Sequence, residues 1–388
     1  MSHTSSRRFD LDWLRIAAFG LLILYHCGML FVTWDFHIKL ARLEWLEPVM
    51  HLSNAWRLSL LFLISGIASA AMLAKTPSGF LGERSRRLLL PLLFGVAVVV
   101  PAQSWVEVQA SGVWTGSYLQ FWRAEYFAFD THLGPILPTW NHLWFIAYLW
   151  FYTLLLALAL HLPAAARTAA ARAAGWALAG SRLLWVPMAA FAVITVTMAD
   201  AWPDTHDLVH DLRAHLVYGS VFAIGLALGP AGPLWPAVTR WWRLALALGL
   251  VGWLAGELML VPAGDPEGLR MAAIRIARAV QGWGMIIGLL GAAQRWLTFD
   301  HRWRLPLAQA VFPAYLFHQT LLILIAWWVR DLTLPAQAAL VLAGTALGTA
   351  AFCVVTARIG WLRRWVGYAG VRAPSWRSSQ ALRSTPPA

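Results

Sequence analysis

Charged residues are scarce in this sequence. Asp, Glu, Lys and Arg make up only 12% of the 388 residues, whereas hydrophobic residues make up 60%. One soluble core of this length would not bury so much apolar side chain, which excludes an ordinary soluble protein. The apolar residues fall into blocks of roughly 18 to 23, the length that a helix needs to cross the hydrocarbon of a bilayer. The composition therefore predicts an all-α, polytopic membrane protein.

Cysteine is almost absent, since the chain has only Cys27 and Cys353. Both lie within apolar blocks, so no disulfide framework is expected. The first apolar block is too long for a signal peptide and is followed by no small-residue cleavage site, so we expect it to remain as the first span. No internal repeat or second domain is visible. The sequence predicts a single transmembrane domain over 1–373 and a disordered cytoplasmic tail over 374–388.

Basic residues outnumber acidic ones by 30 to 18, but they are spread over short connections and form no single basic face. This distribution argues against a nucleic-acid partner. Transmembrane helices are expected near 12–33, 54–74, 87–104, 142–161, 183–200, 213–229, 243–261, 270–292, 306–328 and 335–357. With a cytoplasmic N-terminus, most Lys and Arg residues fall on the cytoplasmic side. The positive-inside rule therefore predicts about ten spans with both termini in the cytoplasm.

Two connections on the opposite side are long, at 34–53 and 105–141. The second contains four Trp residues around Gly and Pro turns. Most Trp residues in a membrane protein belong to the aromatic belt at the interface. A connection of this length is nevertheless long enough to fold over a cavity in the bundle.

The first helix contains two ionisable side chains on one face, Arg15 and His26. Eleven residues separate them, which is about three helical turns and an axial distance of roughly 16 Å. Arg15 is expected at the cytoplasmic mouth, and His26 near the middle of the membrane. An ionisable group at that depth is costly, so it either faces a functional site or forms a buried pair with a neighbouring helix.

A second histidine, His318, is expected at a similar depth in the helix that begins near Pro306. Two histidines at one level favour a functional site over two unrelated buried pairs. A neutral imidazole can accept a proton from a hydroxyl at neutral pH. General-base chemistry is therefore available to this protein.

Three guanidinium groups, from Arg84, Arg86 and Arg87, precede the third predicted helix. They serve either as plain topology markers or as a clamp for phosphate, because Arg forks pair bidentately with phosphate oxygens. They are expected on the same side of the membrane as Arg15. Coenzyme A has its phosphates at one end and its thioester at the other, so a donor held here could extend inward toward His26.

These motifs together resemble the acyltransferase-3 family of bacterial membrane acyltransferases. The first-helix signature is Leu11-Asp12-x-Leu14-Arg15 followed by His26. The other stretches that resemble family motifs are 61–66, Arg84-x-x-Arg87 with Pro91, 142–146 and 315–318. Within the family, His37 and His142-Leu143-Trp144-Phe145 resemble the glucans biosynthesis protein C type, which succinylates periplasmic glucans. The resemblance extends from residue 10 to about 325.

The resemblance implies a multi-pass enzyme of the bacterial inner membrane that moves an acyl group, acetyl or succinyl, from cytoplasmic acyl-CoA to a hydroxyl of an extracytoplasmic glycan. Acyl-CoA would be a substrate, with no permanently bound cofactor. His26 would be the general base. The donor-binding residues would be Arg15, Arg84, Arg86 and Arg87. The residues that line the cavity or bind the acceptor would be Asp12, His37, His142, Trp144 and His318.

Two other functions compete with this hypothesis. A transporter of an anionic or lipid-linked substrate would also suit buried His and Arg residues, but the sequence has no inverted repeat and no paired broken helices. A lipid-linked glycosyltransferase would need an acidic pair with a metal, and no closely spaced carboxylates are expected beside the histidines. Glu257 is expected to pair with Arg275 or Arg278, either as a structural ion pair or as an acceptor-binding group.

No metal site is expected within the membrane. His206 and His210 have helical spacing and lie beside acidic residues, but they are expected in an external loop, outside the cavity. Small residues over 343–348 would permit close helix contact, and hence a homodimer.

Overall fold

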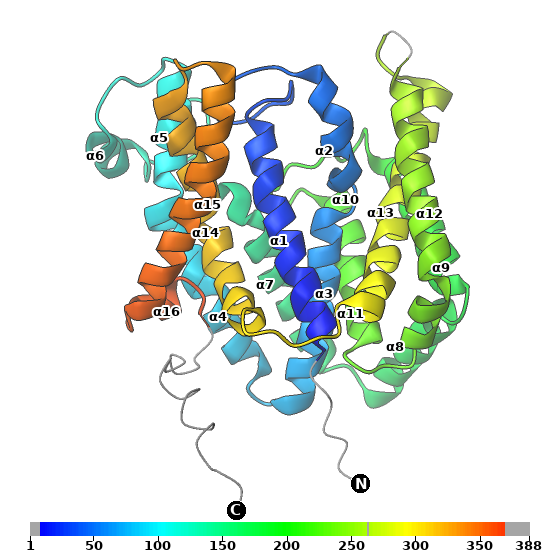
Figure 1. Cartoon of the computed structure of the whole chain (residues 1–388). Coiled ribbons are helices and arrows are strands. Elements are labelled where there is room, and N and C mark those ends of the chain that lie inside the picture. Colours follow the sequence, from blue (N-terminus) through cyan, green and yellow to red (C-terminus); the bar gives the residue numbers. More distant parts are fainter. Residues whose placement is uncertain (1–7, 262–263, 369–388) are drawn as a thin grey trace, which may run out of the picture.

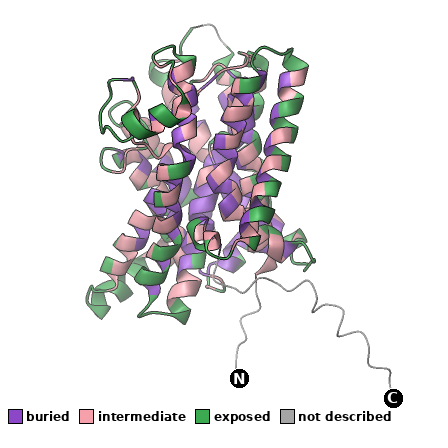
Figure 2. Ribbon diagram, turned by 90° about the vertical axis from the view of Figure 1, so that its left-hand side faces the viewer, coloured by how far each residue is buried: buried purple, intermediate pink, exposed green. Residues whose placement is uncertain are grey.

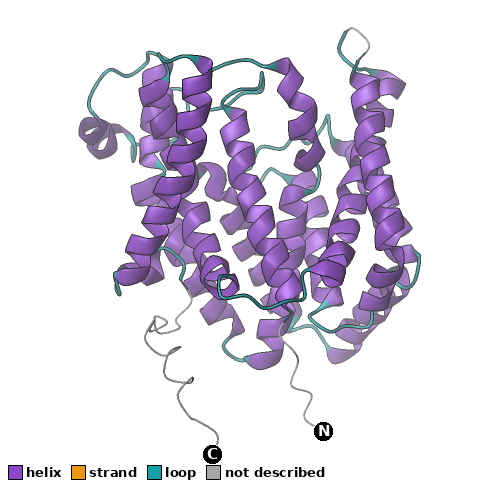
Figure 3. Ribbon diagram, viewed as in Figure 1, coloured by secondary structure: helices purple, strands orange, loops and turns teal. Residues whose placement is uncertain are grey.

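The protein is a bundle of helices (Figures 1 and 3). The computed structural model describes residues 8–261 and 264–368, and every regular element within them is helical, as the sequence predicted. The long helices are α1 (Phe9–Met29), α3 (Arg57–Lys75), α4 (Phe80–Phe94), α7 (Trp144–Ala159), α9 (Arg182–Met198), α12 (Trp235–Leu260), α13 (Gly268–Trp296), α14 (Arg304–Val329) and α15 (Leu334–Arg358). The shorter ones are α2 (Glu47–Asn54), α5 (Pro101–Ala110), α6 (Tyr118–Gln120), α8 (Ala164–Ala177), α10 (Leu212–Ala214), α11 (Ser220–Leu228) and α16 (Leu362–Trp365). The predicted tail over 374–388 lies outside the described residues.

Eight helical segments of the described chain are long and apolar enough to cross a membrane. Each of the ten predicted helices has a helical counterpart, but two of them do not reach this standard alone. One is α9, which joins α8 at a bend of 99° and counts as a ninth span only with it. The other is the shorter apolar segment Leu212–Leu228. The multi-pass architecture is therefore confirmed, while the number ten stays a prediction.

The start of the third span and the connection after the fourth span differ from those expected. The third span begins at Phe80, seven residues before the predicted start, so Arg84 to Arg87 lie on a helix and not in a loop. The predicted cytoplasmic connection after the fourth span contains α8, an exposed helix that is rich in alanine. Alanine has the highest helix propensity of all residues, and α8 therefore forms without an apolar face to bury.

Helix α1 lies in the middle of the view in Figure 1 and packs against α3, α13 and α14. Buried residues follow the inward faces of the helices, and exposed ones gather at the two ends and on the outside (Figure 2). Glycines allow some pairs of helices to pack very closely. On α3, a Cβ added at Gly66 would collide with the backbone of α11 at Phe222 and Gly225. This close contact fixes α3 beside α11.

The span that begins with α4 contains a π-helical stretch, Gly95–Val99, before α5. Pro101 follows it and has no N–H, so carbonyls one turn earlier lack their usual donor. Side chains from the connection after α5 supply the missing donors. Trp122 Nε1 donates to Ala97 O at 2.9 Å, and the Tyr126 hydroxyl donates to Val96 O at 2.8 Å. The broken backbone is thus satisfied where no water would be available. It also docks the long 105–141 connection on the bundle.

Candidate active site

Packing of α1 against α14 brings together the two histidines that the sequence placed at one level. His26 Nδ1 lies 2.8 Å from His318 Nε2, and the two rings are stacked in parallel with centroids 5.0 Å apart. His26 lies in the last turn of α1, whereas His318 lies in the interior of α14 and is fully buried. The two side chains therefore form one unit.

Hydrogen bonds on the far side of His318 determine which ring nitrogens carry protons. His318 Nδ1 faces the carbonyl oxygens of Tyr315 at 2.8 Å and Ala314 at 3.2 Å, so it must be the N–H donor. In a neutral ring, His318 Nε2 is then an acceptor, and His26 Nδ1 must donate to it. This leaves a lone pair on His26 Nε2, which has no hydrogen-bond partner in the part of the chain that the structure describes. In many enzymes, a base that activates a nucleophile is held by a second group in the same way as His318 holds His26 here.

His26 lines a cavity of about 400 Å³, which we call the histidine cavity. Its volume falls within the range of small-molecule sites. Four of the predicted cavity residues are on its wall or behind it: His37, His142 and Trp144 line the cavity, and His318 supports His26 from behind. The two long external connections also contribute, through residues 35–37 and 139–141, as their length suggested.

His142 stands at the start of the fourth span and is held by α14. Its Nε2 lies 3.2 Å from the Tyr315 carbonyl oxygen, the same atom that accepts from His318. Its Nδ1 is 3.4 Å from Gln103 Nε2 of α5. His142 Nε2 is accordingly the donor, and His142 Nδ1 accepts. The ring is locked by bonds on both nitrogens, which suits a wall residue better than a proton-transfer group.

His37 forms a second pair that the sequence did not reveal. Its Nδ1 is 2.5 Å from Glu107 Oε2, and its Nε2 is 3.2 Å from the side-chain nitrogen of Gln319. Gln319 in turn donates to Gln103 at 3.2 Å, which links His37 to His142 through two amides. The sequence predicted no closely spaced carboxylates beside the histidines, and Glu107 is a single carboxylate that it did not anticipate. Glu107 is 70 residues from His37, so no local pattern could have shown the contact.

The connection before α10 also reaches the histidine cavity. Thr205 and His206 line it, and the His206 ring stacks on Trp144 with centroids 4.3 Å apart. The expectation that His206 lies outside the cavity was therefore wrong. His206 stays accessible from the cavity, and desolvation by surrounding protein atoms lowers its pKa. No group of three or more His, Cys, Asp or Glu residues in the described chain could hold a metal ion.

Asp12 does not line the cavity, contrary to the expectation for it. It lies at the opposite end of α1, where its carboxylate is 2.5 Å from Arg304 Nη1 and 3.8 Å from Arg15 Nη2. Arg304 also pairs with Asp300 at 2.7 Å. Asp12 thus ties the start of α1 to the start of α14. This contact sets the register between the helices that carry His26 and His318.

An arginine cluster lies at the end of the bundle where α1 begins, the lower end in Figure 1. Arg84 is buried, and its charge interacts with those of Arg87 and Arg15. Its Nε and Nη2 atoms are buried and have no hydrogen-bond partner among the described residues. A buried guanidinium with two unused donors beside two further positive charges favours binding of an anion. Arg86 is exposed, on another face of α4, and does not belong to this cluster.

Near the opposite end of the bundle, Arg278 and Arg275 form ion pairs with two different acidic residues. Arg278 Nη2 is 2.6 Å from Glu257 Oε1, which confirms that pair. Arg275 instead forms a bidentate pair with Asp200 in an exposed position. Glu257 Oε1 is also 3.1 Å from His51 Nδ1.

The fold is that of a multi-pass membrane protein, and a cavity in it is lined by His26, which is hydrogen-bonded to His318. The family model described as an acyltransferase domain matches residues 8–358, nearly the whole chain. The chain therefore belongs to the acyltransferase-3 family and is an acyltransferase. No curated protein and no solved structure matches it.

Proposed function

We propose that this protein transfers an acyl group from acyl-CoA to a hydroxyl of a carbohydrate, with His26 as general base. The hydrogen-bond chain from the Tyr315 carbonyl through His318 to His26 carries the proposal. It orients the ring and leaves His26 Nε2 as a proton acceptor that faces the histidine cavity.

The reaction needs one proton to move twice. As the acceptor hydroxyl oxygen attacks the thioester carbonyl carbon, its proton passes to His26 Nε2. When the carbon–sulfur bond breaks, the same proton passes from His26 to the departing thiolate, which leaves free coenzyme A and an ester. A positioned base typically contributes about 10²- to 10⁴-fold to such a step, in addition to the gain from holding both substrates in place.

The arginine cluster of Arg84, Arg87 and Arg15 is the proposed binding site for the phosphates of coenzyme A. Arg15 and His26 lie on one face of α1, about three turns and roughly 16 Å apart. The donor can therefore keep its phosphates at the lower end while its arm reaches the histidine cavity. This assigns the lower end to the cytoplasm and the histidine cavity to the outer side of a bacterial inner membrane, with a glycan as acceptor. Acetyl and succinyl are the proposed acyl groups, and periplasmic glucan is the proposed acceptor by resemblance.

Binding of acetyl-CoA to the purified protein in detergent tests the donor half of the proposal. Arg84→Ala should weaken binding about 10- to 150-fold, because hydrogen bonds to charged groups contribute about 1.5–3 kcal/mol. Arg86→Ala, two residues away on an exposed face, should change affinity less than twofold. Equal losses in the two variants would contradict the cluster as the phosphate site. Absence of binding in folded wild-type protein would favour a transporter.

A further inference from the structure

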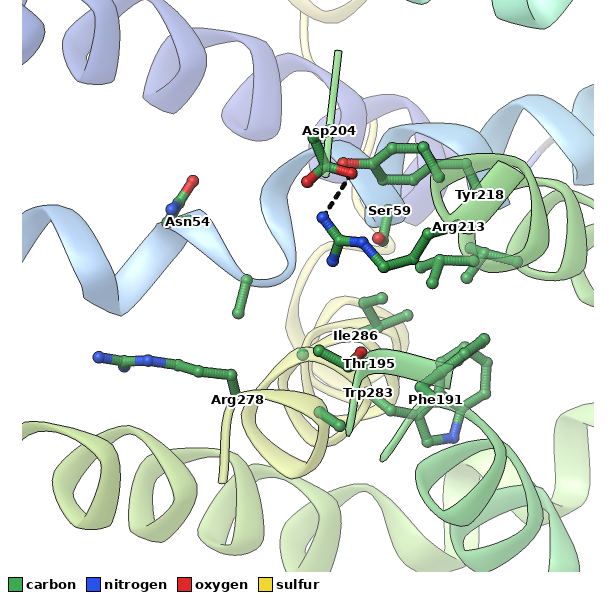
Figure 4. Close-up of a pocket in the computed structure, with 16 residues that line it drawn as sticks. Asn54, Ser59, Phe191, Thr195, Asp204, Arg213, Tyr218, Arg278, Trp283 and Ile286 are labelled. Atoms are coloured by element: carbon green, nitrogen blue, oxygen red, sulfur yellow. Dashed lines mark ion pairs between the residues drawn. The ribbon is translucent and has the colours of Figure 1, made fainter. Parts of the chain in front are cut away.

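A second cavity of about 230 Å³ lies among α3, α9, α11 and α13 (Figure 4). We call it the side cavity. Arg213 extends into it beside Ser59 and Tyr218, with Phe191 and Trp283 on the opposite wall. None of the residues that the sequence analysis singled out as catalytic or donor-binding lines it. The enzyme as proposed so far leaves this cavity without a role.

The side cavity directly adjoins the histidine cavity. Residues that are consecutive in the chain line the two cavities. Leu58 and Thr205 line the histidine cavity, and Ser59 and Asp204 line the side cavity. The wall between them includes Trp144 and Tyr218, whose rings are 5.6 Å apart. A molecule in the side cavity would therefore lie next to the acceptor that reacts at His26.

Three residues with hydroxyl groups line the side cavity, Ser59, Thr195 and Tyr218, and these hydroxyls have no hydrogen-bond partner among the described residues. Helical hydroxyls elsewhere in the bundle usually donate to the carbonyl four residues earlier, as Thr153 does to Leu149 O at 2.7 Å. Ser59 is only 6% exposed, so little of its surface faces anything but protein and the cavity. Hydroxyls that line a cavity and have no protein partner are free to bond to a polar occupant.

Charged and aromatic groups complete the lining. Arg213 pairs with Asp204 at 2.8 Å, which gives the cavity a fixed donor beside a fixed acceptor. Phe191 and Trp283 pack edge to face, with centroids 5.8 Å apart, and form an apolar wall opposite the polar one. Such a combination suits a ring with hydroxyls on its rim and C–H groups on its face. Arg278 also lines the cavity, but its guanidinium pairs with Glu257 at 2.6 Å. An ionic ligand is less suitable because both arginines already have an acidic partner.

We propose that the side cavity is a second carbohydrate subsite, which binds the sugar unit next to the one that is acylated. This inference rests on the proposed function, because it assumes a glycan acceptor. The cavity is smaller than the roughly 300–1,000 Å³ of sites for drug-sized ligands, which fits a single monosaccharide unit. The enzyme then prefers acceptors of at least two units over free monosaccharides.

The test compares glucose with a glucose disaccharide as acceptor, using purified protein and both acetyl-CoA and succinyl-CoA. The wild type should show a lower KM for the disaccharide. In Ser59→Ala/Thr195→Val, the disaccharide KM should rise about 4- to 150-fold, since each lost hydrogen bond contributes about 2- to 12-fold. The KM for glucose and for the acyl-CoA should stay within twofold. A variant that retains the wild-type disaccharide preference would mean that the cavity holds only water.

Thr197→Val is the matched control. It is the same substitution on the same helix, but the Thr197 hydroxyl is exposed and donates to Val193 O at 2.7 Å, so kinetics should not change. If the wild type binds acyl-CoA but acylates neither sugar, the proposed acceptor is wrong. Calorimetric titration of the disaccharide then tests the subsite independently of acyl transfer. Binding to the wild type that is lost in the double variant supports the subsite. Absence of binding to the wild type overturns it.

Discussion

Substitution of His318 by alanine should slow acyl transfer through an effect on His26. His318 is fully buried and does not line the histidine cavity, so it cannot touch the acceptor directly. Its proposed task is to accept the His26 Nδ1 proton and thereby hold the lone pair of Nε2 toward the cavity. Without His318, the His26 ring loses its 2.8 Å partner and can adopt the other tautomer or rotate.

The expected loss of rate in His318→Ala follows from one lost hydrogen bond at a buried site. A buried donor left without a partner costs about 1–3 kcal/mol, which corresponds to about 5- to 150-fold in rate. His26→Ala removes the base itself and should cost about 10²- to 10⁴-fold. His318→Gln should recover part of the loss, because its side-chain oxygen is able to accept the Nδ1 proton.

The assay is kcat for transfer from acetyl-CoA to a sugar acceptor, with acetyl-CoA affinity and thermal unfolding as controls for the fold. The double variant His26→Ala/His318→Ala should be no slower than His26→Ala, because a residue that acts only through another adds nothing once that other is gone. A double variant slower by a further tenfold, or a His318→Ala enzyme as impaired as His26→Ala, would refute the positioning role.

Two further predictions concern the fold that supports the site. Gly66→Ala should lower stability by about 1–3 kcal/mol, because its Cβ would collide with Phe222 O of α11; Gly20→Ala, where the added Cβ meets open space, should not reduce the thermal unfolding temperature. Trp122→Phe should cost about 1–3 kcal/mol, because it leaves Ala97 O without its donor; a denaturation midpoint equal to that of the wild type would contradict this role for the indole.

The sequence predicted the features that depend on local composition and helical periodicity. Apolar blocks of membrane-crossing length predicted a helical multi-pass protein, because lipid requires each span to satisfy its own backbone. The spacing of Arg15 and His26 placed them on one face of α1, which is a property of any α-helix. Short motifs also indicated the family, which the match over residues 8–358 confirms.

Several features were settled only by tertiary structure, because they join residues far apart in the chain. The 292 residues between His26 and His318 carry no signal for their contact, nor do the 70 between His37 and Glu107. Asp12 belongs to a helix-start ion pair with Arg304 because of how α1 lies along α14. The side cavity likewise exists only where four helices meet. A sequence specifies which side chain each helix presents, and helix packing decides which of them meet and which are left facing a cavity.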